Sequence, residues 1–79
     1  MRLLFFAHLK TAANCAVTEL RVDGEIDADQ LWQRLLAQFP GLARYQRSVR
    51  FARNGAYAVT GTRFSDTDEV ALIPPVSGG

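Results

Sequence analysis

The last seven residues of the chain combine a stiff approach with an end that has no side chains. Two prolines follow an apolar stretch directly, and two glycines end the sequence Ile73-Pro74-Pro75-Val76-Ser77-Gly78-Gly79. Glycines lack a Cβ and can pass through a narrow slot, whereas prolines restrict the backbone before it. A terminal carboxylate is ionised at neutral pH and is a poor electrophile until it is activated. Transfer of AMP from ATP gives an acyl adenylate that a sulfur nucleophile can attack, so Gly79 is the candidate reacting residue.

The other residues with reactive side chains have structural interpretations. His8 has no acidic or hydroxyl partner nearby in the sequence, and we interpret it as a surface or interface residue of a strand. Cys15 is the only cysteine, which excludes an internal disulfide, and we interpret it as a small packing residue. Asp66, Asp68 and Glu69 are expected to supply turn hydrogen bonds ahead of a strand. No metal site is predicted.

The composition predicts one small globular domain. The chain has 79 residues, of which 48% are hydrophobic and 22% charged, as in ordinary folded domains. Its formal net charge of +1 argues against nucleic acid as a partner. No apolar stretch approaches the ~20 residues of a membrane span, and the apolar run near the start is too short for a secretion signal. We therefore expect a cytoplasmic protein with no membrane partner.

Hydrophobic patterns predict one helix among several strands. Asp27 followed by Gln30 forms a capping box, and Pro40-Gly41 ends the helix that it starts. The apolar stripe of this helix consists of Ala28, Leu31, Trp32, Leu35 and Phe39. Asn54-Gly55 lies between two apolar runs, which is typical of a hairpin. The predicted strands are residues 3–9, 16–22, 49–53, 56–59 and 69–73, with the polar stretch 10–14 ending the first.

Two segments of the sequence resemble a known family. The start, Arg2-Leu3-Leu4-Phe5-Phe6-Ala7, and the end, Asp66-Thr67-Asp68-Glu69-Val70-Ala71-Leu72-Ile73-Pro74-Pro75-Val76-Ser77-Gly78-Gly79, resemble the small, sulfur-carrying subunit of molybdopterin synthase, the MoaD family. The order of elements is that of the ubiquitin-like β-grasp fold. The resemblance implies an α+β fold with a mixed four- to five-stranded sheet, in which one main helix packs on one face and the first and last strands are central neighbours. Residues 1–75 are expected to form this domain and residues 76–79 a flexible tail.

The resemblance also implies a reaction. Gly79 is expected to be adenylated by an E1-like, MoeB-type enzyme that uses ATP, and then converted to a thiocarboxylate with sulfur from a persulfide donor. Gly78, Ser77 and Val76 are expected to insert into a large, MoaE-type subunit, which supplies the pocket and catalytic side chains of this sulfurtransferase. There the sulfur passes to cyclic pyranopterin monophosphate and builds the molybdopterin dithiolene. The implied assembly is a heterotetramer with no permanently bound cofactor.

The alternation of side chains along the strands predicts which residues lie on each face of this sheet, and the two faces are expected to pack against different partners. Leu3, Phe5, Leu20, Val70 and Leu72 are expected to face the helix, whereas Leu4, Phe6, Ala71 and Ile73 gather on the other face with Tyr57. An exposed apolar patch of this kind indicates a docking surface. The residues expected to bind the large subunit are Phe6, Leu4, Lys10, Tyr57, Ile73, Pro74 and Pro75.

The sequence departs from the family pattern at two positions and leaves other functions open. Thr67 stands where the family often has Gly, and Lys10 where Arg is common, which keeps the charge without the planar fork. One alternative is a ThiS-type carrier for thiazole synthesis, although such carriers are usually shorter and lack the Pro-Pro-Val approach. A modifier that conjugates to lysines, like ubiquitin or Urm1, is another. A non-catalytic β-grasp binding module is the third.

Overall fold

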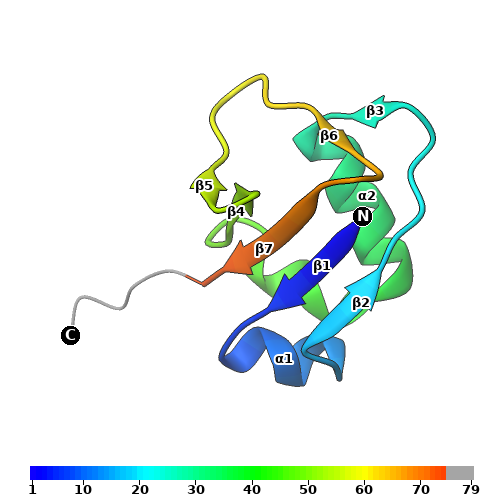
Figure 1. Ribbon diagram of the computed structural model, residues 1–79. Coiled ribbons are helices and arrows are strands. Elements are labelled where there is room, and N and C mark those ends of the chain that lie inside the picture. The colour runs from blue at the N-terminus through cyan, green and yellow to red at the C-terminus, as the bar shows by residue number, and fades with distance from the viewer. Residues whose placement is uncertain (75–79) are drawn as a thin grey trace.

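The computed structural model describes residues 1–74, and a five-stranded mixed sheet forms its centre (Figure 1). The strand order is β2-β1-β7-β4-β5, and the central strands β1 and β7 run parallel while the other pairs are antiparallel. The bounds of these strands are Arg2–Phe5 for β1, Val17–Glu19 for β2, Arg50–Arg53 for β4, Ala56–Tyr57 for β5 and Glu69–Ile73 for β7. The predicted β-grasp fold, with its first and last strands as central neighbours, is confirmed.

Helix α2 (Ala28–Gln38) begins at the predicted capping box. The Asp27 carboxylate accepts from the Gln30 N–H at 2.8 Å, and the Gln30 side-chain oxygen accepts from the Asp27 N–H at 2.9 Å. These two bonds satisfy backbone donors that the first turn of a helix leaves without partners. The helix ends before Pro40, which opens the 3₁₀ helix η1 (Pro40–Tyr45).

The core lies between α2 and one face of the sheet. The five strand residues expected to face the helix are all buried: Leu3, Phe5, Leu20, Val70 and Leu72. On α2, Leu31, Trp32 and Leu35 are buried as predicted, whereas Ala28 in the first turn is exposed. Phe39 follows the helix, and its ring packs edge-on to Phe5 at 5.4 Å between centroids. Phe39 therefore packs the C-terminal end of α2 against β1.

The prediction of one strand over residues 3–9 was wrong in its second half. β1 ends at Phe5, the chain turns at Ala7 with φ of 52°, and a short helix α1 (His8–Ala13) follows. Leu9 and Ala13 are buried four residues apart, which is a helical period. The aromatic residues before them continue the strand pattern, so the sequence did not reveal the change from a strand period to a helical period. His8 is consequently an exposed residue of a helix, not of a strand.

Several short elements were not predicted or were predicted too long. Residues 16–22 and 56–59 form strands of only three and two residues, although Leu20 and Val22 are buried as their alternation requires. A second sheet pairs β3 (Glu25–Ile26) with β6 (Phe64–Ser65), and η1 precedes β4. Two-residue strands are too short to show a hydrophobic period, so pattern analysis could not detect them.

Candidate functional site

The outer face of the sheet, opposite α2, carries an apolar row across all five strands. Leu4 pairs in register with Val17 on one side and with Ala71 on the other. Ala71 in turn pairs with Ala52, and Ala52 with Tyr57. Because register partners in a sheet project from the same face, these five side chains form one continuous apolar line from edge to edge.

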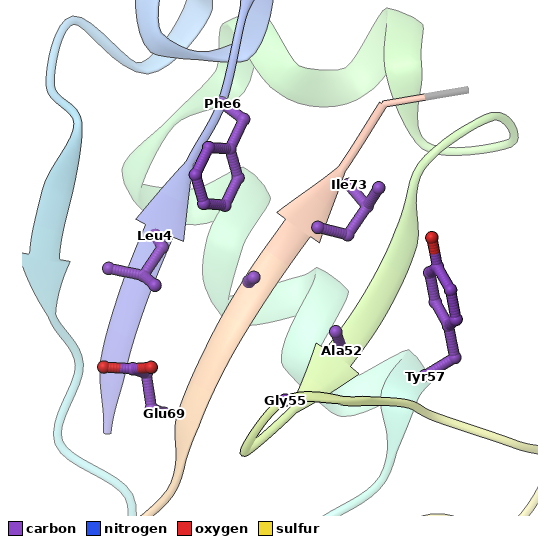
Figure 2. A pocket seen from close by; sticks show the side chains of 8 residues that line it. Leu4, Phe6, Ala52, Gly55, Tyr57, Glu69 and Ile73 are labelled. Carbon is purple, nitrogen blue, oxygen red and sulfur yellow. The ribbon is translucent and has the colours of Figure 1, made fainter. Parts of the chain in front are cut away.

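A hollow of about 360 Å³ lies over this row (Figure 2). Figure 2 shows Leu4 and Phe6 on one side of it, Ile73 on β7, and Tyr57 at the far side. Phe6 and Tyr57 are 45% and 55% exposed, which is unusual for aromatic side chains of a small domain. The residues lining the hollow are Leu4, Phe6, Ala52, Gly55, Tyr57, Glu69, Ala71 and Ile73. The predicted grouping of apolar side chains is thus present, and its role as a docking surface stays a prediction.

Charged groups border the apolar row on both sides. One row nearer the start of β7, Arg2 lies between Glu19 and Glu69 in register, with 3.7 Å between the Arg2 guanidinium and the Glu69 carboxylate. One row nearer its end, Arg50 pairs with Ile73, and its guanidinium carbon lies 4.3 Å from the centre of the Tyr57 ring. An apolar centre with a charged rim is the usual anatomy of a protein–protein interface.

The chain leaves the sheet at Pro74, directly after the end of β7 and beside this hollow. Pro74 is half-buried. The other tail residues named from the sequence lie outside the described residues, so their roles stay predictions: Pro75, Val76, Ser77, Gly78 and Gly79. Lys10 lies on α1 and is not among the residues that line the hollow. The structure therefore brings together Leu4, Phe6, Tyr57 and Ile73, but does not place Lys10 with them.

The acidic residues at the start of β7 have structural roles, but only one of them makes the predicted turn hydrogen bond. The backbone N–H of Val22 at 2.9 Å, and then the terminal ammonium of Met1, lower the pKa of the Asp66 carboxyl. Burial raises the pKa of Asp68, but hydrogen bonds from the Ser65 N–H and the Asn54 side chain outweigh it and lower that pKa overall. Asp68 thus supplies the predicted turn hydrogen bond, whereas Asp66 ties this turn to the chain start and to Val22, and the Glu69 side chain pairs with Arg2 instead.

The remaining interpretations from the sequence concern His8, Cys15, metal binding and membrane spans. His8 packs against the ring of Tyr45 from η1, with 4.9 Å between the ring centroids. Cys15 is half-buried and packs against the core, as predicted. Within residues 1–74, no group of three His, Cys, Asp or Glu side chains is arranged to hold a metal ion, and no helix has the length and apolar character needed to cross a bilayer.

Sequence reasoning missed part of the hollow. Ala52 and Gly55 reach it because the Asn54-Gly55 turn folds β5 back beside β4, and Glu69 closes its other end (Figure 2). The Asn-Gly signal located this hairpin. That signal could not predict that β4 lies beside β7, because strand order depends on contacts between distant segments.

Comparison with known proteins decides the family. The model of the ThiS family matches residues 3–79. The chain belongs to the ThiS family. It is 33% identical to the human molybdopterin synthase sulfur carrier subunit and 34% identical to that of Drosophila melanogaster, over 100% of this chain and 93% and 90% of those proteins. The resemblance noted in the sequence is confirmed, and these relatives support a role as a sulfur carrier.

Solved structures agree on the fold of this ThiS-family chain. SAMP1 from Haloferax volcanii is 31% identical with a TM-score of 0.84, covering 100% of this chain and 98% of that one. A putative molybdopterin converting factor subunit 1 from Pyrococcus furiosus, at 20% identity and a TM-score of 0.81, shares the fold over 95% of both chains. In Helicobacter pylori, a subunit 1 of the molybdopterin-converting factor has been solved in complex with subunit 2; it is 23% identical with a TM-score of 0.68 and covers 99% of this chain and 96% of that one.

Proposed function

We propose that this chain is the small, sulfur-carrying subunit of a molybdopterin synthase. The observation that carries the proposal is its similarity, over its whole length, to the human sulfur carrier subunit of that enzyme. The position of the apolar hollow supports it independently, because the hollow lies beside the point where β7 delivers the chain to the tail. A docked partner is then correctly placed to receive the chain end.

The activation chemistry belongs to the carboxylate of Gly79. One carboxylate oxygen attacks the α-phosphorus of ATP, pyrophosphate leaves, and an acyl adenylate forms. The terminal sulfur of a donor persulfide attacks the carbonyl carbon and displaces AMP, and a thiol then cleaves the S–S bond to release the thiocarboxylate. An E1-like, MoeB-type enzyme catalyses the first step, so the carrier itself has no resident cofactor. Since these steps need ATP and reduced thiols, we assign the cycle to the cytoplasm.

The partner surface is the outer face of the sheet. Phe6, Tyr57 and Ile73 bury apolar area against the large, MoaE-type subunit, together with Leu4, and burial of each such side chain is worth roughly 1.5–3 kcal/mol. Pro74, Pro75 and Lys10 extend the contact toward the tail. Val76, Ser77 and Gly78 carry the thiocarboxylate into the pocket of that subunit, where its sulfur passes to cyclic pyranopterin monophosphate. Two such deliveries complete one dithiolene, which agrees with a heterotetramer holding two carriers.

The experiment that tests activation is the intact mass of the chain after co-production with an activating enzyme from the same organism. We expect a species in which one oxygen is replaced by sulfur, and its loss when ATP binding by the enzyme is abolished. A variant that ends at Gly78 is the matched control, because it changes the chain end without touching residues 1–74. An unchanged mass in the presence of active enzyme and sulfur donor contradicts the proposal.

A second candidate function has specific support. SAMP1, which is 31% identical, is described as a small archaeal modifier protein in a second structure from the same organism. A modifier uses the same acyl adenylate, but a lysine amine replaces the sulfur nucleophile and an isopeptide bond forms. Digestion of cellular proteins and mass spectrometry for lysines that carry the Gly-Gly remnant distinguish the two functions. The ThiS-type alternative shares the thiocarboxylate and differs only in its acceptor, so assays with each precursor separate it.

A further inference from the structure

The acidic residues of the chain gather at one end of the molecule, which we call the acidic end. All eight acidic residues lie in β2, β3, the start of α2, the turn before β7, the first position of β7, or the intervening loops: Glu19, Asp23, Glu25, Asp27, Asp29, Asp66, Asp68 and Glu69. The sheet registers bring these segments to one end, since Arg2 pairs with both Glu19 and Glu69, and Glu25 pairs with Ser65. Figure 1 shows β3, β6 and the starts of β1 and β7 at this end, away from α1.

Four exposed cations occupy the opposite end, which we call the cationic end: Lys10, Arg44, Arg47 and Arg50. Lys10 belongs to α1, which packs against η1 so closely that a Cβ on Gly41 would lie 3.0 Å from the Ala12 carbonyl oxygen. Arg44 and Arg47 lie at and just after the end of η1. Arg50 starts β4 and is the register partner of Ile73 at the end of β7. The cationic end therefore lies at the end of the sheet where the chain leaves β7, and Arg50 is the cation nearest to that exit in register (Figure 1).

None of these four cations forms an ion pair within residues 1–74, whereas Arg2 and Arg63, which lie among the acidic residues, each have a carboxylate partner. At the acidic end, Arg2 pairs with Glu69 and Arg63 with Glu25 at 3.8 Å. At the cationic end, the guanidinium of Arg44 lies 5.5 Å from the centre of the Tyr45 ring, and that of Arg50 lies over Tyr57. Stacking on an aromatic face orients a guanidinium and leaves its charge available to another molecule.

The net charge of the whole chain conceals this arrangement. A formal charge of +1 indicates weak attraction to any charged surface, but a separation of charge along the molecule gives it an electric dipole whose positive end is the tail exit. Such a dipole turns the molecule during its approach to a charged partner. It raises the association rate constant much more than the final affinity, which suits a carrier that must bind, be modified and leave.

We propose that the cationic end steers this chain, tail foremost, onto an acidic surface around the catalytic pocket of the enzyme that activates its C-terminus. The inference rests on the proposed function for the identity of that enzyme. The apolar hollow continues into the cationic end at Tyr57, so one docking event engages both surfaces. The partner chemistry that fits is a cluster of carboxylates beside an apolar patch.

The test measures association of the chain with its activating enzyme by stopped-flow fluorescence over a range of salt concentrations. The variant pair Arg44→Glu with Arg47→Glu is compared with Arg21→Glu with Arg34→Glu, which makes the same change in net charge at exposed positions near the acidic end. We expect the first pair to lower the association rate constant about ten-fold or more at low salt, and the second to change it much less. The difference should vanish near ~1 M salt, where the screening length is about 3 Å.

Several outcomes overturn the inference, and they are distinguishable from failure of the proposed function. If the wild-type chain acquires sulfur normally while both pairs associate at equal rates, only the steering proposal is wrong. If the wild-type chain neither binds nor is activated, both proposals fall. If a short single-stranded oligonucleotide binds the wild-type chain and not the Arg44→Glu, Arg47→Glu pair, while enzyme association is unaffected, the cationic end is a nucleic-acid site instead. The neutral pair Arg44→Gln with Arg47→Gln should give an intermediate rate, and thermal unfolding of each variant verifies its fold.

Discussion

The side chain of Asn54 connects the β4–β5 turn to the carboxylate of Asp68. Its Nδ2 donates to Asp68 Oδ1 at 2.9 Å, and its Oδ1 accepts from the Glu69 N–H at 2.9 Å. Asn54 has φ of 51°, a left-handed conformation that asparagine tolerates better than most residues. The residue that forms the hairpin turn therefore also fixes the hairpin against the start of β7, and with it the wall of the hollow formed by Gly55 and Tyr57.

The Asp68 carboxylate should make stability depend on pH. Its pKa is lowered in the folded chain from an ordinary value of 3.8. A depressed pKa contributes stability that is present above this value and is lost as the pH falls through the folded-state pKa. We expect Asp68→Asn to lower the melting temperature at neutral pH, with the difference from wild type shrinking in acid. Thermal melts as a function of pH measure this, and Asp23→Asn is the control; equal pH profiles for Asp68→Asn and wild type would refute the assignment.

Leu35 should be a principal contributor to the core between α2 and the sheet. Its side chain is 1% exposed, so Leu35→Ala removes buried methyl groups and leaves a cavity. We expect a loss of about 2–5 kcal/mol in the free energy of unfolding, measured by urea denaturation. Leu36→Ala, at the half-buried neighbouring position, should cost less. A Leu35→Ala midpoint equal to that of wild type would show that α2 does not cover this face.

The exposed ring of Phe6 should be needed for binding and dispensable for folding. Phe6→Asp places a charge on the apolar hollow, and we expect its affinity for the large subunit to fall on the order of 30-fold or more, as at other interface hot spots. Val59→Asp is the matched control, because Val59 is 75% exposed and does not line the hollow. Isothermal titration measures the affinities and circular dichroism the fold. Unfolding of Phe6→Asp would instead indicate a second small core on this face.

The length of the chain end should matter for sulfur transfer and not for docking. Adding one residue after Gly79 moves the carboxylate by about 3.3–3.6 Å, far beyond the ~0.5 Å tolerance of a reacting centre. Gly78→Val keeps the length and adds a branched side chain where the backbone passes through a slot. We expect each variant to bind the large subunit like wild type and to lose adenylate formation or sulfur delivery. An extended chain that still supports turnover would favour the non-catalytic binding module.

Local signals in the sequence predicted the elements that have them, and failed where structure depends on distant contacts. Asp27 and Gln30 specified the start of α2, and Asn54-Gly55 the hairpin, because capping and turn chemistry involve neighbouring residues. The end of β1 was misplaced because Phe6 continues the alternation of Leu4 past the last residue of the strand. The chain turns at Ala7 instead, where Leu9 and Ala13 pack into the core from α1.

Some residues of the candidate site could also be predicted from the sequence, and others could not. Leu4, Phe6, Ala71 and Ile73 were grouped correctly, because alternation assigns faces once β1 and β7 are neighbours. That neighbourhood came from resemblance to a family, since no local pattern encodes a parallel pairing between the two ends of a chain. Arg50 was missed because its importance arises only when the sheet places it over Tyr57 and beside Ile73.

A single-turnover sulfur transfer tests directly whether this chain donates sulfur from its C-terminus. The chain is first charged with sulfur at Gly79, separated from the activating enzyme, and mixed with the large subunit and cyclic pyranopterin monophosphate. The mass of the chain and the sulfur content of the pterin are followed together. We predict that the chain returns to its carboxylate form as the dithiolene appears, with two chains consumed for each dithiolene. A chain that keeps its sulfur, or a pterin that gains none while the chain is consumed, would show that the chain is not the sulfur donor.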